Sequence, residues 1–547
     1  MRAKLGSSLP PGDKHGVSVY IPTWEDTVAW GRRDPELIAQ LKTGYPRFFV
    51  PLVVNELAER LLTWASDLSW KFLATEFREE LRQSLKESGR SAMLITARHH
   101  AKDLQRYLDE QQLTRAFTFM VDFEGNIRPV EKLENGSDLN EISVVVYPPR
   151  GAKEAKEFWQ HTGFGISSRR ATYWLENAPF LNRGRELPEA ILPVQEAKEA
   201  KVNIQQRIAD SFSTEDNKLK KSDVLLYPTG MSAISHTHDI ISLYTTTTKK
   251  TIAIFGFLYV DTVKVISNIH GYECKIYSGT QYDLETLEEE LAAGLELCAL
   301  FTEFPGNPLL GSVDLERIKR LSDEFFFLFV VDDTVGTSVN VDVISHCDVV
   351  CTSLTKMFSG GCNVMGGSVT LNPKSRGHWD MKRRLKDRYV NTYFPLDMIV
   401  MEKNSTDFEE RVTEASQNAE HLADTLRKHS SVGQVYYPKG SPTQRLYEKY
   451  KRPGKGYGYL LSIRFNTPAA AIAFHDALDV AKGPSLGTNF TLGCAYTLFA
   501  HFHELEWAEK YGVAEHLVRI SVGIENERFL DEVIKTALDA AERANKK

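Results

Sequence analysis

The sequence is poor in cysteine and has no apolar run long enough to cross a membrane. Only 6 of its 547 residues are cysteine, and no two of them form a Cys-x-x-Cys pair. This pattern excludes a disulfide framework and indicates reduced cysteines in a reducing compartment. A transmembrane helix needs about 18 consecutive apolar residues, and residues 1–11 lack the apolar segment of a secretory signal. We therefore expect a cytoplasmic protein with no membrane partner.

Excess positive charge and metal-binding motifs are also absent. The formal net charge is −7, which gives no electrostatic basis for binding nucleic acid or an anionic membrane. His236 with His238, and His501 with His503, are two residues apart and have no third ligand at useful spacing. Because residues i and i+2 do not face each other on a helix, we expect no metal site.

What the sequence does contain is a regular alternation of apolar strands and helices between residues 221 and 396. Unbroken apolar segments predict strands buried on both faces, as in a parallel sheet. With the helical stretches between them, they predict the βαβ order of an α/β domain with a mostly parallel sheet. The predicted strands are residues 224–227, 251–255, 274–277, 297–301, 326–331, 348–352 and 367–371.

The flanking regions differ from this central part. Residues 397–547 combine polar helices with a few strands, which predicts a small α+β domain. Residues 1–160 mix an edge strand at 17–22, helices over 52–85 and a strand at 142–149. This N-terminal region contains no nucleophile, metal motif or phosphate loop, so we expect a structural or oligomer-stabilising role, with regulatory ligand binding as the alternative. The catalytic domain is then expected over residues 161–396.

A lysine preceded by hydroxyl residues follows one predicted strand. Ser353, Thr355 and Lys356 come directly after the segment 348–352. A lysine amine in this position can form a Schiff base with pyridoxal phosphate (PLP), and neighbouring hydroxyls can bond its phosphate. The alternative is a lysine on the surface, where most lysines lie.

Two other strand ends carry matching signals. Asp332 follows the apolar segment 326–331, where open α/β sheets bind ligands, and it can pair with the pyridinium nitrogen of PLP. A helix N-cap is the simpler interpretation of a lone aspartate. Gly230 and Met231 lie at a turn from a strand into a helix, where backbone N–H groups bind anions.

Taken in this order, these segments resemble the cystathionine γ-synthase family of Cys/Met-metabolism PLP enzymes, in particular its long fungal-type members. The resemblance implies the aspartate-aminotransferase-like fold (fold type I). It assigns Gly230, Met231, Ser353 and Thr355 to the phosphate, and Asp332 to the pyridinium. Further matches are Lys356 for the Schiff base, Asn307 near the phenolic oxygen of the cofactor, Arg519 for the substrate carboxylate, and Ser485 in the substrate loop.

Two of these assignments have competitors within the sequence. The tyrosine that covers the cofactor ring matches Tyr259 when the preceding strand is aligned, but an ungapped count from Gly230 reaches Phe255. We prefer Tyr259, because loop length varies more easily than strand register. In the family an arginine of the neighbouring subunit reaches the phosphate. Here Arg169 or Arg170 is the candidate, and the resemblance implies a homodimer or homotetramer with shared active sites.

The implied activity is γ-substitution on an O-acylated homoserine, with cysteine as the nucleophile and cystathionine as the product. The bacterial pattern has an acidic residue where Phe490 stands, so the nucleophile stays open. The alternatives are a sulfide, carbon or nitrogen nucleophile in secondary metabolism, a cystathionine- or methionine-type lyase, and a non-catalytic regulator with a PLP fold. In each enzymatic case the partners are small amino-acid substrates.

Overall fold

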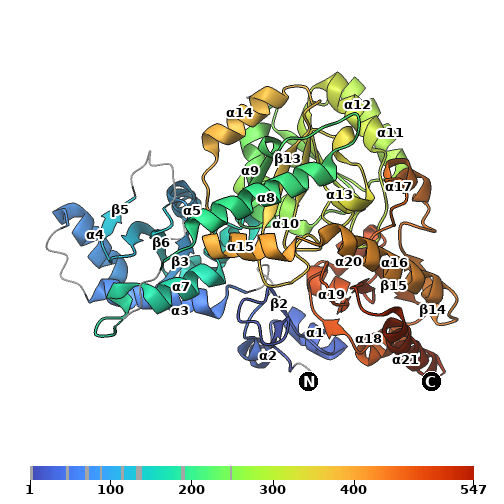
Figure 1. Ribbon diagram of the computed structural model, residues 1–547, viewed down its shortest axis with the longest axis horizontal. Coiled ribbons are helices and arrows are strands. Elements are labelled where there is room, and N and C mark those ends of the chain that lie inside the picture. The colour runs from blue at the N-terminus through green and yellow to red at the C-terminus, as the bar shows by residue number, and fades with distance from the viewer. Residues whose placement is uncertain are drawn as a thin grey trace.

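The computed structural model places the chain in a central α/β domain flanked by an N-terminal α/β unit and a small C-terminal domain (Figure 1). No helix of the described residues combines the length and the apolar character needed to cross a membrane. The structure describes residues 4–44, 49–67, 73–86, 89–111, 116–130, 138–186, 191–246 and 249–546.

The central domain is built on a seven-stranded sheet of strand order β7-β13-β12-β11-β10-β8-β9. Strands β9, β8, β10, β11 and β12 run parallel, and only β13 pairs antiparallel with both of its neighbours. The predicted mostly parallel sheet is therefore confirmed. The strands are β7 Val224–Tyr227, β8 Thr251–Phe255, β9 Glu273–Tyr277, β10 Leu297–Glu303, β11 Leu328–Asp332, β12 Val349–Thr352 and β13 Gly367–Leu371.

Helices cover both faces of this sheet, which explains its unbroken apolar strands. In β11, Leu328 and Val330 pack toward α9 and α14, whereas Phe329 and Val331 pack toward α8, α11 and α12. The helices of the domain are α8 Val194–Phe212, α9 Gly230–Ile241, α10 Val260–Lys264, α11 Gln281–Ala292, α12 Leu315–Phe325, α13 Thr337–Asn340, α14 His378–Arg388 and α15 Pro395–Asn404.

The small domain has a mainly antiparallel five-stranded sheet of order β14-β15-β18-β17-β16. It agrees with the α+β expectation, although α15 packs along α8 across the expected boundary at residue 397. The strands are β14 Val432–Tyr436, β15 Leu460–Phe465, β16 Ala481–Lys482, β17 Leu492–Ala495 and β18 Val518–Ser521. The helices are α16 Phe408–Arg427, α17 Gln444–Tyr450, α18 Pro468–Ala477, α19 Tyr496–His501, α20 Leu505–Lys510 and α21 Glu527–Asn545.

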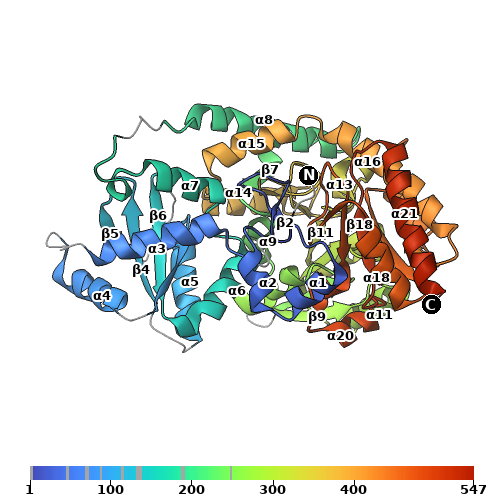
Figure 2. The same ribbon diagram turned by 90° about the horizontal axis from the view of Figure 1, so that it is seen from below.

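The N-terminal α/β unit has a four-stranded antiparallel sheet of order β3-β6-β4-β5. Helices α3, α4 and α7 pack on one face, and α5 and α6 on the other (Figure 2). The strands are β3 Ser91–Ile95, β4 Phe117–Asp122, β5 Ile127–Pro129 and β6 Glu141–Tyr147. The helices are α3 Leu52–Ser66, α4 Thr75–Lys86, α5 Arg98–Glu110, α6 Ala152–Thr162 and α7 Ser168–Asn177.

The first described segment, residues 4–44, does not belong to that unit. Its apolar side chains share a core with α19, α20 and the end of the small domain, and Ile21 donates its backbone N–H to the carbonyl of Lys482. The region expected as one N-terminal unit over 1–160 is therefore divided between two places. The segment contains β1 Ser8–Leu9, β2 Ser18–Val19, α1 Trp24–Gly31 and α2 Pro35–Gln40, so the strand expected at 17–22 is only two residues long.

Candidate active site

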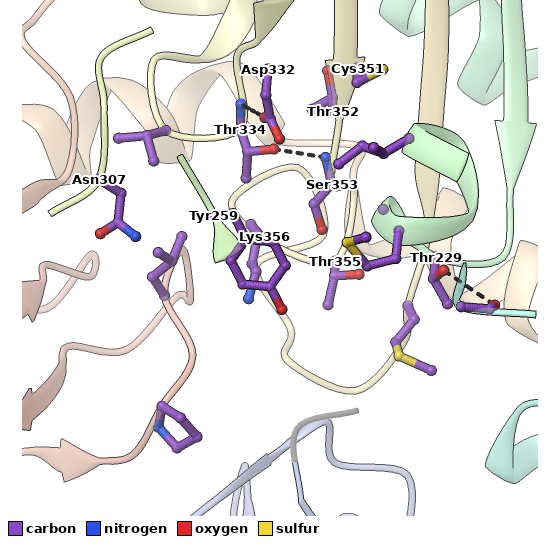
Figure 3. Close-up of a pocket in the computed structure, with 18 of the residues that line it drawn as sticks. Thr229, Tyr259, Asn307, Asp332, Thr334, Cys351, Thr352, Ser353, Thr355 and Lys356 are labelled. Atoms are coloured by element: carbon purple, nitrogen blue, oxygen red, sulfur yellow. Dashed lines mark hydrogen bonds between the residues drawn. The ribbon is translucent and has the colours of Figure 1, made fainter. Parts of the chain in front are cut away.

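A cavity lies where the carboxyl ends of β10, β11 and β12 meet the first turn of α9 (Figure 3). Open α/β sheets bind their ligands at this edge. Residues from distant parts of the chain point into one space here. The predicted site residues in its wall are Gly230, Met231, Tyr259, Asn307, Asp332, Ser353, Thr355, Lys356 and Arg519.

One end of the cavity is suited to an anion. Helix α9 begins at Gly230 with Thr229 as its N-cap, and the first N–H groups of a helix have no intrahelical acceptor. A Cβ atom at Gly230 would lie 2.8 Å from Cβ of Ser353, so only glycine allows this approach. The hydroxyl of Thr355 is bonded to the backbone of Gly366, donating to its carbonyl at 3.3 Å and accepting its N–H at 3.1 Å.

Lys356 occupies the middle of the cavity and is buried. Its Nζ donates a hydrogen bond to Oγ of Ser485 at 3.1 Å. This bond links the segment after β12 in the central domain to a loop of the small domain. That loop is held close by Gly487, which has a φ of 67°. A Cβ atom at this position would come within 2.5 Å of the backbone nitrogen of Met357.

Asp332 ends β11 and is partly buried in the cavity wall. Its Oδ1 accepts the backbone N–H of Thr334 at 2.9 Å, and Oγ1 of Thr334 accepts the N–H of Ser353 at 2.9 Å. Burial raises the pKa of Asp332 above its ordinary value, although Thr334 and then the charge of Lys356 act in the opposite direction. A cationic group beside this carboxylate would offset the burial cost.

The structure separates the two aromatic candidates. Tyr259 is the residue before α10 and lines the cavity. Phe255 lies inside the hydrophobic core instead, with its ring centroid 6.0 Å from that of Tyr277. The geometry therefore agrees with the alignment through the strand and not with the ungapped count.

Arg519 reaches the cavity from β18 of the small domain. It donates to Oδ1 of Asn307 at 3.1 Å and to the carbonyl of Ser485 at 2.9 Å. Its guanidinium carbon lies 4.9 Å from the ring centroid of Tyr496. The structural alternative, an ion pair with Glu525, is not formed, because the carboxylate of Glu525 is bonded to the backbone N–H and hydroxyl of Thr491.

The arginine pair lies outside the cavity wall. Arg170 is buried and donates to the carbonyls of Asp138, Leu139 and Glu141, which gives it a structural role within its own protomer. Arg169 forms an ion pair with Asp397 at 3.0 Å. It faces a separate hollow that adjoins the cavity through Met365.

Several wall residues were missed by the sequence reasoning. Glu303 ends β10 next to Asp332, and a carboxylate at the end of an apolar strand was the signal that already pointed to Asp332. Trp159 comes from α6, Ile166 from the segment between α6 and α7, and Phe499 from α19. No local pattern marks these three, because tertiary packing alone brings them to the cavity.

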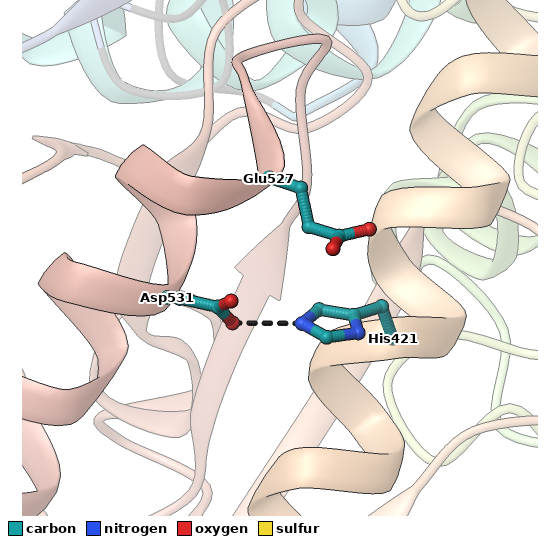
Figure 4. Close-up of side chains that lie close together, drawn as sticks. All are labelled: His421, Glu527 and Asp531. Atoms are coloured by element: carbon teal, nitrogen blue, oxygen red, sulfur yellow. Dashed lines mark hydrogen bonds and ion pairs between the residues drawn. The ribbon is translucent and has the colours of Figure 1, made fainter.

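A possible metal cluster lies elsewhere. Among the described residues, one group of three metal-ligating side chains converges, formed by His421, Glu527 and Asp531 on α16 and α21 (Figure 4). Nε2 of His421 lies 2.7 Å from Oδ1 of Asp531, so this is also an ordinary partly exposed ion pair. None of the three residues lines the cavity.

The cavity residues fit PLP. The glycine cradle at the start of α9 suits a phosphate, the partly buried Asp332 suits a pyridinium nitrogen, and the buried amine of Lys356 suits an aldehyde. The three groups line one cavity. A single flat cofactor with these three functional groups can therefore engage all of them.

Comparisons with known proteins agree with this fit. The profile described as "Cys/Met metabolism PLP-dependent enzyme" matches residues 209–539, and "Fungal trans-sulfuration enzyme, N-terminal domain" matches residues 73–167. The cystathionine gamma-synthase-like protein ankD of Aspergillus thermomutatus is 36% identical over 99% of this chain and 95% of its own length. The cystathionine gamma-synthase of Neurospora crassa is 34% identical over 98% of both chains.

A solved structure gives the same fold. The cystathionine gamma synthase from Xanthomonas oryzae pv. oryzae, in complex with aminoacrylate and cysteine, superposes with a TM-score of 0.54 at 20% identity. The match covers 64% of this chain and 88% of that chain. The family profile and the full-length relatives together establish that this chain belongs to the Cys/Met-metabolism family of PLP-dependent enzymes, with pyridoxal phosphate as its cofactor.

Proposed function

We propose that this enzyme replaces the acyloxy group on Cγ of an O-acylated homoserine, with cysteine as the nucleophile and cystathionine as the product. The observation that carries this proposal is the pairing, in one cavity, of a buried amine with a carboxylate-binding arginine, Lys356 and Arg519. The full-length relatives named for cystathionine gamma-synthase support the choice of reaction. Cystathionine formed in this way would enter methionine biosynthesis by transsulfuration.

Bound PLP supplies an electron sink for the electrons of the Cα–H bond. Lys356 removes the proton from Cα and carries protons between Cα and Cβ, with its amine oriented by the hydroxyl of Ser485. Arg519 binds the α-carboxylate through its planar fork, and Asn307 holds that fork in place. Tyr259 covers the face of the cofactor ring. The acyl group leaves Cγ as a carboxylate, and the sulfur of cysteine bonds to Cγ with loss of the thiol proton.

The remaining wall bears on the nucleophile. Phe490, which stands where the bacterial pattern has an acidic residue, does not line the cavity. The wall beyond the cofactor residues is largely apolar and includes Trp159, Ile166 and Phe499. A sulfide, carbon or nitrogen nucleophile of secondary metabolism is therefore the second candidate.

Product analysis tests this function. We expect purified enzyme, given O-acetyl- or O-succinyl-homoserine and a panel of nucleophiles, to yield cystathionine by mass spectrometry only when cysteine is present. Release of 2-oxobutanoate or pyruvate without a nucleophile would instead identify a lyase. A different adduct would identify another nucleophile, and no turnover of any acyl-homoserine would indicate a regulator.

We also propose that the active enzyme is at least a homodimer in which Arg169 reaches the phosphate of the neighbouring subunit. The support is its position in a hollow beside the cavity, where Asp397 holds the side chain. Inactive Arg169→Ala and Lys356→Ala proteins, mixed under conditions of demonstrated subunit exchange, are expected to recover activity through hybrid sites. No recovery would place Arg169 outside the shared site.

The six free cysteines support a reducing, cytoplasmic compartment.

A further inference from the structure

Glu303 is a partly buried carboxyl group in the cavity wall that the reaction described above does not use. It is the last residue of β10 and lies in register with Asp332, the last residue of β11. Its Oε1 accepts the backbone N–H of Tyr259 at 2.6 Å, and its Oε2 accepts the backbone N–H of Asn307 at 3.2 Å. Within the described residues, no basic side chain is paired with it.

These two hydrogen bonds connect segments that carry the chemistry. Tyr259 precedes α10, and Asn307 lies in the loop after β10, so neither backbone is held by the sheet ladder. Asn307 in turn accepts a hydrogen bond from Arg519 of the small domain at 3.1 Å. One carboxyl group therefore holds the backbone of Tyr259 and, through Asn307, the arginine expected to bind the substrate carboxylate.

Placing an acid here is costly, which argues for a specific role. Burial, together with the nearby charge of Asp332, raises the pKa of Glu303 above its ordinary value. A glutamine would remove the electrostatic cost, but it offers one acceptor oxygen where the structure uses two.

We propose that Glu303 is a positioning residue that sets the ring of Tyr259 and the Asn307–Arg519 pair relative to the cofactor. The proposal rests on the proposed function insofar as Arg519 binds an amino-acid carboxylate. Glu303 acts through the two backbone N–H groups that it accepts.

The test compares Glu303→Gln with wild type as PLP-loaded enzymes. The amide loses one of the two acceptors and turns an NH₂ group toward a backbone N–H. A buried donor left unsatisfied corresponds to a roughly ten- to hundredfold effect. We expect kcat/KM for O-acyl-homoserine to fall by about that factor, mainly through KM, while the cofactor stays bound.

A second readout separates this proposal from the proposed reaction. L-Norleucine has no leaving group, and its dissociation constant can be measured from the change in cofactor absorption. We expect Glu303→Gln to weaken norleucine binding about tenfold, whether or not the wild type performs γ-replacement. Failure of γ-replacement in the wild type would overturn the proposed function and leave this measurement intact.

Asp348 provides a matched control. It is a buried carboxyl group at the residue before β12, and its Oδ2 accepts the backbone N–H of Phe329 at 2.9 Å. It also pairs with Lys319 at 3.1 Å and lies outside the cavity. Asp348→Asn is expected to lower the melting temperature and to leave norleucine binding unchanged. If Glu303→Gln does not fold, Glu303→Asp takes its place, since the shorter side chain cannot reach both N–H groups. Wild-type kinetics and norleucine affinity in the folded variant, or an equal loss in Asp348→Asn, would overturn the proposal.

Discussion

Helix α9 separates two cavities whose buried ionisable groups differ in kind. At its N-terminus lies the catalytic cavity, with the carboxyl groups of Glu303 and Asp332 and the amine of Lys356. Along its flank, between the N-terminal α/β unit and the catalytic domain, lies a second cavity. Five of the 15 histidines of the chain line this second cavity: His99, His100, His236, His238 and His270.

Burial shifts the pKa values of the ionisable groups in the two cavities in opposite directions. In the catalytic cavity burial raises the pKa of Asp332 and of Glu303, and a bound cation can offset the cost of the charge on Asp332. In the histidine cavity burial lowers the pKa of His99 to about 4 and that of His270 to about 3. The rings of His238 and His270 stack with centroids 4.3 Å apart. The first cavity is therefore organised around a charged ligand, and the second around neutral imidazoles.

Removing the amine from the catalytic cavity is expected to have the largest effect. In Lys356→Ala, turnover should fall by about 10²- to 10⁴-fold or more, because proton transfer at Cα and Cβ loses its base. In the wild type, borohydride treatment should fix the cofactor to Lys356, as read by peptide mass spectrometry. A cofactor label on another lysine would refute the site assignment.

Neutralising the carboxylate at the end of β11 is expected to have the second-largest effect on turnover. In Asp332→Asn, PLP should still bind, but turnover should fall by roughly 10²- to 10³-fold, the effect of losing one strong electrostatic contact. Absorption spectra and steady-state kinetics measure the two quantities separately. Near-normal turnover would mean that Asp332 only caps the turn at Thr334.

Changing the arginine fork should have a smaller effect. Arg519→Lys keeps the charge but loses the planar pair of donors, so amino-acid substrates should bind about 1.5–3 kcal/mol less tightly, mainly through KM. The PLP spectrum should be unchanged. Because Arg519 also donates to the carbonyl of Ser485, the melting temperature is a necessary parallel measurement. A lowered melting temperature with unchanged KM would make Arg519 a structural residue.

Acidification tests the histidine cavity and should give the smallest effect, a lowered stability of the fold. The cavity histidines with lowered pKa values are neutral when folded, so the unfolded chain binds more protons as pH falls below about 6.5. Stability is then fully present above pH 6.5 and is lost progressively toward pH 4. Calorimetry from pH 7.5 to 5 should show a melting temperature that falls with acidity.

The groups that face these histidines decide how steep this loss is. Asp239 acts to raise the pKa of His99 and Arg388 acts to lower it. Asp239 also lies 3.3 Å from Nδ1 of His236 and 3.7 Å from Arg388, and Asp103, Arg106, Glu110 and Tyr107 complete the ionisable wall. His99→Gln combined with His270→Gln should flatten the dependence on pH. His503→Gln, an exposed histidine outside the cavity, is the matched control, and an equal flattening there would contradict the argument.

Asp332 and Lys356 were predicted because they follow buried strands, whereas Arg519 and Ser485 were assigned through the family resemblance. In β18, Arg519 and Ser521 are two residues apart and therefore lie on one face of the strand. Arg519 donates to the carbonyl of Ser485, and Ser521 accepts the N–H of Gly487, so both reach one loop. Register within a strand is a local property, and for this reason a single sequence specifies it well.

What the sequence did not reveal depends on contacts between distant segments. Nothing local distinguishes Trp159 in α6 from an ordinary core tryptophan, and the histidine cavity forms only when α5 meets α9. The segment 4–44 was assigned to the N-terminal region by proximity along the chain. Its apolar positions carry no information about which surface will cover them.

The docking of that first segment has a consequence for biosynthesis. The backbone N–H of Trp24 is bonded to Asp476, and Nζ of Lys482 reaches the carbonyl of Pro22. Asp476 and Lys482 leave the ribosome 452 and 460 residues after Trp24 and Pro22. At about 5–20 residues per second, residues 22–24 are without these two partners for roughly 20 to 90 seconds. The N-terminal α/β unit can fold during that interval, so these contacts form only after the small domain has been synthesised.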